Sequence, residues 1–252
     1  MRHFGLLGYP LGHSFSQAFF EEKFLREGIS DAAYHLFERP NAGDFLREAE
    51  ELNLLGFNVT IPHKQALLRR LVMGDAAAEA LGVVNCVKRK TGASGAIEWQ
   101  GYNTDVVGFS RSIKPFLASH HTRALVLGNG ATAKSVRWVL SQLGIDVVLA
   151  ARNPSQDMPT ALRFRDLESI GFGPFPLVVN TTPVGTLHFP EQALPIPYSG
   201  FSADHLVVDV VYNPPETALL AAARGQGAVV LNGLSMLQEQ AEASWRIWNS
   251  AD

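Results

Sequence analysis

Residues 124–133 read Ala124-Leu125-Val126-Leu127-Gly128-Asn129-Gly130-Ala131-Thr132-Ala133. A short apolar strand leads directly into the pattern G-x-G-x-x-A, and a helical pattern follows to Leu143. In dinucleotide-binding domains the first glycine permits a tight turn, the second lets the backbone approach a pyrophosphate, and the small third residue lets helix and strand pack closely. The first turn of the helix offers free N–H groups to phosphates. Because strand, turn and helix occur in the required order, the motif predicts a Rossmann-type domain rather than a glycine turn without a ligand.

The end of the next strand indicates which dinucleotide binds. NAD sites usually place Asp or Glu about 20 residues after the glycine turn, where the carboxylate accepts a hydrogen bond from a ribose hydroxyl. Here the strand Val147–Ala150 is followed by Ala151-Arg152-Asn153-Pro154, which contains no acidic residue. A planar guanidinium such as that of Arg152 suits a 2′-phosphate, although a solvated loop arginine is the plainer alternative. The sequence therefore favours NADP.

Short apolar strands and helices continue to alternate toward the C-terminus, as in a parallel sheet with crossover helices. A final helical pattern spans residues 235–249. We expect two α/β domains: residues 1–104, completed by 235–252, bind substrate and carry the chemistry, and residues 105–234 bind the dinucleotide. The later elements expected in the second domain are strands Leu177–Thr181, Leu206–Val210 and Ala228–Leu231, with a helix at Thr217–Arg224.

The first hundred residues show a second alternation of strands and helices. Thr104 is expected to cap the helix that bridges to the nucleotide domain, and Asn41 to cap a helix ending near Asn53. A further helix is expected from about His63 to Leu71, and a short one at Asp75–Leu81. The expected strands are Phe4–Gly8, Ala32–Phe37, Gly56–Ile61, Gly82–Lys88 and Ile97–Gly101.

Composition excludes several classes of protein. The chain has 252 residues, 46% of them hydrophobic, and a net charge of −3, which gives no reason to expect nucleic acid or an anionic membrane as partner. Cys86 is the single cysteine and has apolar neighbours, so we expect a core residue and neither a disulfide nor a metal site. The apolar stretch after Arg2 ends at Gly8, and no run approaches a membrane span of ~20 residues. We expect a cytoplasmic monomer or homodimer.

Polar side chains follow the apolar strands of the N-terminal half. Hydroxyls, an amide, an amine and a carboxylate together suit a polyhydroxylated acid, and a lysine held at a strand end can move a proton to or from a substrate oxygen. Taken singly, they have structural explanations as helix caps, a turn amide, a first-turn acid and a surface cation. They are Ser14 and Ser16 after the first strand, Thr60 and Lys64 after the third, Asn85 within a strand, and Asp105 at the bridging helix.

Seven motifs that contain these residues occur in order along the chain. They are the H-S-x-S loop within Gly8–Ser16, N-V-T-x-P-x-K at Asn58–Lys64, Gly82–Asn85, Asn103–Asp105, Asn180–Gly185, Tyr212–Pro214 and Gly233–Gln240. With these motifs the chain resembles the shikimate dehydrogenase family over nearly its whole length. The resemblance implies reversible, NADP-dependent reduction of 3-dehydroshikimate to shikimate, a step of aromatic amino-acid biosynthesis.

The resemblance also implies a role for each matching residue. Lys64 and Asp105 would form the catalytic pair, and Tyr212 would line the cleft. The substrate would contact Ser14, Ser16, Thr60, Asn85, Asp105, Tyr212 and Gln240. The cofactor would contact Gly128, Asn129, Gly130, Ala131, Arg152, Thr182 and Gly233.

Three positions depart from the family pattern. Ala131 stands where a further glycine is usual, and Gln17 where proline is common. The family's N-R-T after the second nucleotide-domain strand is Ala151-Arg152-Asn153, so one amide contact to the 2′-phosphate is missing. None of the three touches the proposed catalytic pair.

Other candidates remain open at this point. His13 and His63 are rival acid–base groups, which we rank below Lys64 because His63 should point away from it and His13 precedes the serine loop. The alternatives in function are a quinate/shikimate dehydrogenase of broader substrate or cofactor use, a non-catalytic NADP-binding sensor, and a reductase of another small molecule. Arg152 argues against NAD use, retention of Lys64, Asp105 and Gln240 against the sensor, and the H-S-x-S loop against the third.

Overall fold

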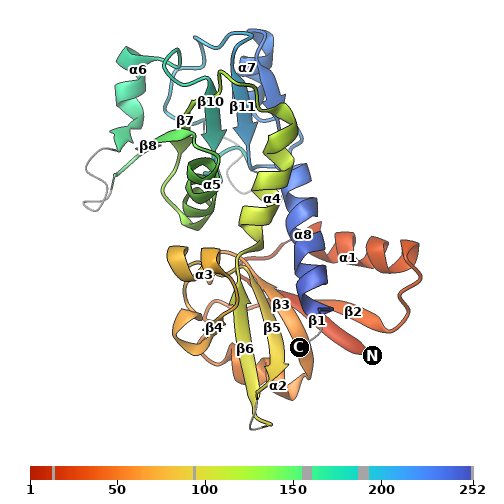
Figure 1. Cartoon of the computed structure of the whole chain (residues 1–252). Helices are drawn as coiled ribbons and strands as arrows, with labels where there is room; N and C mark the ends of the chain where they lie inside the picture. The colour runs from red at the N-terminus through yellow and green to blue at the C-terminus, as the bar shows by residue number, and fades with distance from the viewer. Residues whose placement is uncertain (13–14, 93–94, 155–160, 187–192, 251–252) are drawn as a thin grey trace. The chain divides into compact units, whose positions relative to one another are not determined.

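The computed structural model describes residues 1–12, 15–92, 95–154, 161–186 and 193–250 (Figure 1). The chain divides into two compact units, Met1–Val107 with Gln240–Asp252, and Gly108–Glu239. The boundaries expected after residues 104 and 234 lie a few residues before the observed ones, which follow Val107 and Glu239. Helices α4 and α8 each contain one of the two crossing points, so each contributes residues to both units.

The described residues of the first unit form a six-stranded mixed sheet in the order β2-β1-β3-β5-β6-β4. Strands β1, β2 and β3 are parallel, whereas β5 runs antiparallel to both β3 and β6. Helix α1 packs on β1 and β2, α2 on β3, and α3 beside β4 and β6. The elements are β1 (Arg2–Gly8), α1 (Phe15–Arg26), β2 (Ala32–Glu38), α2 (Phe45–Glu51), β3 (Leu54–Val59), the 3₁₀ helix η1 (Leu68–Arg70), β4 (Val72–Met73), α3 (Ala76–Leu81), β5 (Cys86–Thr91), β6 (Ile97–Tyr102), α4 (Thr104–Ile113) and α8 (Leu234–Trp248).

An aromatic cluster fixes the end of α8 against this sheet. The ring of Trp248 stacks on Phe4 with 4.9 Å between centroids, and its Nε1 donates to the carbonyl of Val87 at 3.0 Å. Gly56 of β3 makes room for it, since a Cβ there would lie 2.3 Å from the indole. Lys23 of α1 is buried and bonds Glu242 of α8 at 2.9 Å. The part of α8 that belongs to the first unit therefore has one defined position on the sheet.

The described residues of the second unit form a six-stranded sheet in the order β12-β11-β10-β7-β8-β9, and every neighbouring pair is parallel. Helix α5 packs on β7 and β8, and α7 on β11 and β12. This doubly wound order, which reverses between β7 and β10, confirms the expected Rossmann-type fold. The elements are the 3₁₀ helix η2 (Lys114–Phe116), β7 (Arg123–Leu127), α5 (Ala131–Gln142), β8 (Asp146–Ala151), β9 (Leu162–Arg163), η3 (Phe164–Asp166), α6 (Leu167–Ile170), β10 (Leu177–Asn180), β11 (Leu206–Asp209), α7 (Ala218–Gly225) and β12 (Val229–Leu231).

The expected helix from His63 to Leu71 is wrong. After β3 the chain makes successive turns and forms only the short 3₁₀ helix Leu68–Arg70. An α-helix would need the carbonyl of Lys64 to accept from the N–H of Leu68, but that carbonyl accepts from the N–H of Val84 at 2.9 Å. A tertiary hydrogen bond has replaced the helical one, and it holds the backbone of Lys64 in place.

Two expected helix caps and one strand start are also wrong. Asn41 bonds the N–H of Gly43 at 2.8 Å and so closes a turn, while α2 begins later. Thr104 lies inside α4, and Asn103 caps that helix by accepting from the N–H of Val106 at 3.3 Å. The strand expected to begin at residue 82 starts only at Cys86. Among the described residues, every helix is too short or too polar to traverse a lipid bilayer.

Candidate active site

Lys64 is held by its backbone and paired through its side chain. Its carbonyl accepts from Val84, and the preceding turn is closed by the N–H of His63 donating to the carbonyl of Thr60 at 2.8 Å. Its Nζ lies 2.5 Å from Oδ2 of Asp105, and the two side chains are only 13% and 8% exposed. An ion pair this deeply placed is sensitive to loss of either partner, because the remaining charge would be left largely buried and unpaired.

The carboxylate of Asp105 is fixed from its other side by Asn85. Asp105 lies in the first turn of α4, and its Oδ1 accepts from Nδ2 of Asn85 at 2.8 Å. The amide of Asn85 is itself oriented, because its Oδ1 accepts from the backbone N–H of Thr104 at 2.6 Å. The two carboxylate oxygens thus have different partners, and Asp105 keeps one orientation while it contacts Lys64.

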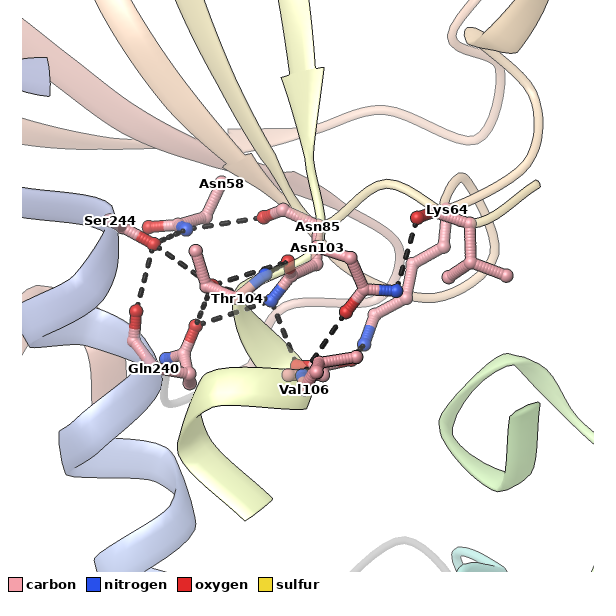
Figure 2. A network of polar contacts seen from close by, with 10 residues as sticks. Asn58, Lys64, Asn85, Asn103, Thr104, Val106, Gln240 and Ser244 are labelled. Carbon is pink, nitrogen blue, oxygen red and sulfur yellow. Dashed lines mark hydrogen bonds and ion pairs between the residues drawn. The ribbon is translucent and has the colours of Figure 1, made fainter. Parts of the chain in front are cut away.

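Helix α8 adds a second row of polar side chains to this cluster (Figure 2). Oε1 of Gln240 lies 3.4 Å from both Nδ2 of Asn85 and Oγ1 of Thr104. One helical turn later, Ser244 donates to the carbonyl of Gln240 at 2.9 Å, and its Oγ accepts from Nδ2 of Asn58 at 2.8 Å. We call Asn58, Lys64, Asn85, Thr104, Asp105, Gln240 and Ser244 the polar cluster.

The remaining substrate residues expected from the sequence are not all joined to the polar cluster by direct bonds. Ser16 lies in α1 close to Tyr34, whose hydroxyl donates to Oδ1 of Asn58 at 2.9 Å. Thr60 is half-buried in the turn before Lys64. Tyr212 lies in the second unit after β11, where burial raises the pKa of its phenol. Ser14 lies outside the described residues.

One of the two rival histidines lies in the described part of the chain, and it does not displace Lys64. The ring of His63 is buried, and its Nε2 lies 2.6 Å from the carbonyl of Arg39, away from the polar cluster. This placement confirms the expectation that His63 points away from Lys64. His13 lies outside the described residues.

The glycine turn of the second unit leaves room for a phosphate group. Gly128 has φ of +106°, and a Cβ there would lie 2.8 Å from Oγ1 of Thr181, so the protein's own packing requires glycine. Gly130 is different, because its φ of −78° suits any residue and a Cβ would meet nothing within 4 Å. The space beside Gly130 is open, and Ala131 begins α5 there. This geometry fits a pyrophosphate at the helix N-terminus.

The other cofactor residues expected from the sequence surround this turn or follow neighbouring strands. Nδ2 of Asn129 donates to the carbonyl of Asn153 at 3.4 Å, next to the exposed Arg152 at the tip of β8. Thr182 follows β10, with its N–H and hydroxyl both donating to Asn180. A Cβ on Gly233 would lie 2.0 Å from the carbonyl oxygen of Val210, so only glycine lets α8 start so close to β11.

Burial strongly raises the pKa values of Tyr34, Cys86 and Asp209. Burial raises the pKa of Cys86 to about 12, which confirms it as an unreactive core residue. Burial also raises the pKa of Asp209, at the end of β11, to about 6, although hydrogen bonds from Val211, Thr217 and Asn180 oppose this. In the described part of the chain, no group of three His, Cys, Asp or Glu could hold a metal ion.

Comparison with known proteins decides the family. A model of the shikimate dehydrogenase substrate-binding domain matches residues 6–87. The shikimate dehydrogenase (NADP(+)) of Shouchella clausii is 34% identical over 262 residues, which cover 98% of this chain and 92% of the relative. The chain belongs to the shikimate dehydrogenase family.

Solved structures of the family share the whole fold. Shikimate 5-dehydrogenase from Thermus thermophilus, in complex with NADP(H) and shikimate, aligns with a TM-score of 0.83 and 30% identity over 99% of this chain and 94% of that one. Quinate dehydrogenase from Corynebacterium glutamicum, in complex with NAD, aligns with a TM-score of 0.85 and 29% identity over 98% and 93%. Family membership therefore establishes an N-terminal substrate domain and a C-terminal Rossmann-type domain.

Within this shikimate dehydrogenase fold, sequence reasoning missed three members of the polar cluster. Thr104 was expected only as a helix cap, and Asn58 and Ser244 were not expected at the site at all. Asn58 opens the N-V-T-x-P-x-K motif, of which only Thr60 and Lys64 were expected at the site. Ser244 follows Gln240 by four residues, a spacing that places both on one face of α8. Both are buried and hydrogen-bonded to residues expected at the site. The helical spacing from Gln240 was the signal that could have identified Ser244.

Proposed function

We propose that this chain catalyses the reversible, NADP-dependent reduction of 3-dehydroshikimate to shikimate. The observation that carries the proposal is the buried pair of Lys64 and Asp105, 2.5 Å apart and oriented by Asn85. An amine and a carboxylate in contact can store and deliver one proton, which is what reduction of a carbonyl to a hydroxyl requires. A non-catalytic sensor of NADP would have no use for this pair.

In the proposed reaction the protein supplies the proton and the orientation. NADPH, when bound, supplies the hydride to the carbonyl carbon. The ammonium of Lys64 gives a proton to the carbonyl oxygen, and in the reverse direction the Lys64 amine takes the proton of the same hydroxyl. The second oxygen of Asp105 is anchored by Asn85, so the carboxylate stays in place while the lysine changes charge.

Further side chains would hold the substrate for this transfer. We assign the amides of Asn85 and Gln240 and the hydroxyls of Ser14, Ser16 and Thr60 to the hydroxyl and carboxylate groups of shikimate, together with Tyr212. The amides of Asn85 and Gln240 already form hydrogen bonds with other side chains of the polar cluster. Such bonds hold each group in a single orientation before substrate arrives, which lowers the entropic cost of binding.

We assign the second unit to NADP. Gly128, Asn129, Gly130 and Ala131 would bind the pyrophosphate, Arg152 the 2′-phosphate, and Thr182 and Gly233 the adenosine and nicotinamide parts. The open space beside Gly130 and the absence of an acid in the tip Ala151–Pro154 support this assignment. We also propose a cytoplasmic location, where NADPH for biosynthesis is available, and a monomer or homodimer, which light scattering would distinguish.

The test is to incubate the pure protein with shikimate and NADP and to follow the absorbance of reduced nicotinamide. A rise that Lys64→Ala abolishes is the expected result, and no rise would contradict the proposal. Quinate and NAD should be tested in parallel, because the quinate dehydrogenase relative was solved with NAD. We expect shikimate with NADP to be the preferred pair, since Arg152 stands where an NAD site usually has an acid.

A further inference from the structure

A basic groove lies at the tip of β8 in the second unit. It has a volume of roughly 470 Å³, and its lining contains three arginines and one glutamate. Pro195 and Ile196 add an apolar wall. The lining residues are Arg152, Asn153, Arg163, Phe164, Arg165, Glu168, Pro195 and Ile196.

The backbone places Arg163 beside Arg152. Strands β8 and β9 are parallel, with Ala151 in register with Arg163. Neighbouring strands lie about 4.8 Å apart, so Arg163 stands next to the residue that precedes Arg152. Asp166 accepts from the N–H of Arg163 at 2.8 Å, which fixes the turn that follows. The two arginines thus come from adjacent strand ends, and both side chains line the groove.

The groove adjoins the glycine turn. Asn153, one of its lining residues, accepts at its carbonyl from Nδ2 of Asn129, the middle residue of the turn. In a Rossmann domain the pyrophosphate lies at that turn and the adenosine ribose at the end of the second strand. A group on the ribose 2′ position would therefore enter the groove.

We propose that Arg163 is a second ligand of the 2′-phosphate and determines the preference for NADP together with Arg152. A phosphate monoester carries a charge of about −1.5 to −2, which two arginines match. Arg163 would supply donors in place of the amide that Ala151 lacks. Arg165 contributes less, because its Nε lies 3.9 Å from the carboxylate of Asp166, which already offsets part of its charge. Glu168 would repel the phosphate with one negative charge, which the two positive charges of Arg152 and Arg163 outweigh.

The proposal rests on the proposed function only in its choice of dinucleotide, so binding is measured separately from turnover. Calorimetry with adenosine 2′,5′-bisphosphate and with AMP isolates the 2′-phosphate. Arg163→Gln should raise the Kd of the bisphosphate about tenfold to hundredfold and leave the Kd of AMP within twofold. This is the effect expected for loss of a charge-assisted hydrogen bond. Arg224→Gln, which removes an arginine bonded to Glu216 outside the groove, is the matched control and should change neither.

The outcomes separate the two proposals. Equal affinity of the wild type and Arg163→Gln for the bisphosphate would overturn the role of Arg163. A loss of affinity for AMP as large as that for the bisphosphate would overturn it too. Turnover of shikimate with NADP would then still support the proposed function. Conversely, selective loss of the bisphosphate without any shikimate turnover in the wild type would support the site and contradict the function. In an active enzyme, Arg163→Gln should raise KM for NADP and not KM for NAD.

Discussion

Replacing Ser244 with alanine should weaken the polar cluster without touching the Lys64–Asp105 pair. The hydroxyl is fully buried and bonds three groups: Asn58 at 2.8 Å, the carbonyl of Gln240 at 2.9 Å and Thr104 at 3.2 Å. Without it, Nδ2 of Asn58 keeps the carbonyl of Asn85 at 3.2 Å, but its other N–H has no remaining acceptor among the residues that the structure describes. A buried donor left unsatisfied costs about 1–3 kcal/mol.

The loss is measurable as a shift in thermal unfolding. Tryptophan fluorescence reports mainly on the first unit, because Trp99, Trp245 and Trp248 lie there and only Trp138 lies in the second. For a chain of this size, about 1–3 kcal/mol lowers Tm by roughly 2–12 °C. Ser169→Ala is the control, since that exposed hydroxyl bonds only the nearby carbonyl of Asp166, just before its helix, and its loss should change Tm little.

Activity adds a second readout for the same variant. Loosening of Gln240 should raise KM for shikimate several-fold while KM for NADP stays unchanged. A Tm within 1 °C of the wild type, together with an unchanged KM for shikimate, would refute the view that Ser244 holds Gln240 in the cluster.

Three further predictions concern separate features. Gly56→Ala should destabilise the first unit by about 1–3 kcal/mol, because the new Cβ would overlap Trp248, and urea unfolding with unchanged stability would contradict this packing. The raised pKa of Asp209 means that the folded state holds its proton more tightly than the unfolded chain. Its stabilising contribution is therefore present below the unfolded pKa of about 3.9 and is lost as pH rises to about 6. Urea titrations between these pH values should show that the free energy of unfolding of the wild type falls as pH rises, and that this fall is absent in Asp209→Asn. Asp105→Asn keeps the shape of the side chain but removes its charge, so kcat should fall by about 10²-fold or more. Steady-state rates in both directions test this prediction. A near-normal kcat would mean that the charge of the carboxylate has no role in the reaction.

Local patterns in the sequence were sufficient to predict most of the fold. The alternation of apolar strands with helices predicted the parallel sheet of the second unit, because strands buried on both faces read as continuous apolar runs such as Leu177-Val178-Val179. The glycine turn was equally clear, since Gly128 needs a positive φ that few other residues adopt.

Where prediction failed, contacts distant in sequence decided the structure. Residues 63–71 have helical spacing, but the carbonyl of Lys64 bonds Val84, twenty residues further on. Thr104 is a good capping residue by type, yet its hydroxyl lies among Asn85 and Ser244, and Asn103 caps the helix instead. Pairings of this kind are set by tertiary packing, which single-sequence propensity does not contain.

The same limit applies to the candidate site. Lys64, Asn85, Asp105 and Gln240 could be named from their motifs, but the motifs do not say which atoms meet. That Asp105 uses one oxygen for Lys64 and the other for Asn85 follows only from the structure. The groove formed by Arg152 and Arg163 was also out of reach, because it depends on the register of β8 with β9.

The central claim is that Lys64 moves the proton that accompanies hydride transfer. The most direct test is kcat of Lys64→Ala for oxidation of shikimate by NADP, measured at saturating concentrations of both. The account predicts a fall of about 10²- to 10⁴-fold with KM for NADP little changed. A kcat within threefold of the wild type would contradict this account, because another group would then have to transfer the proton.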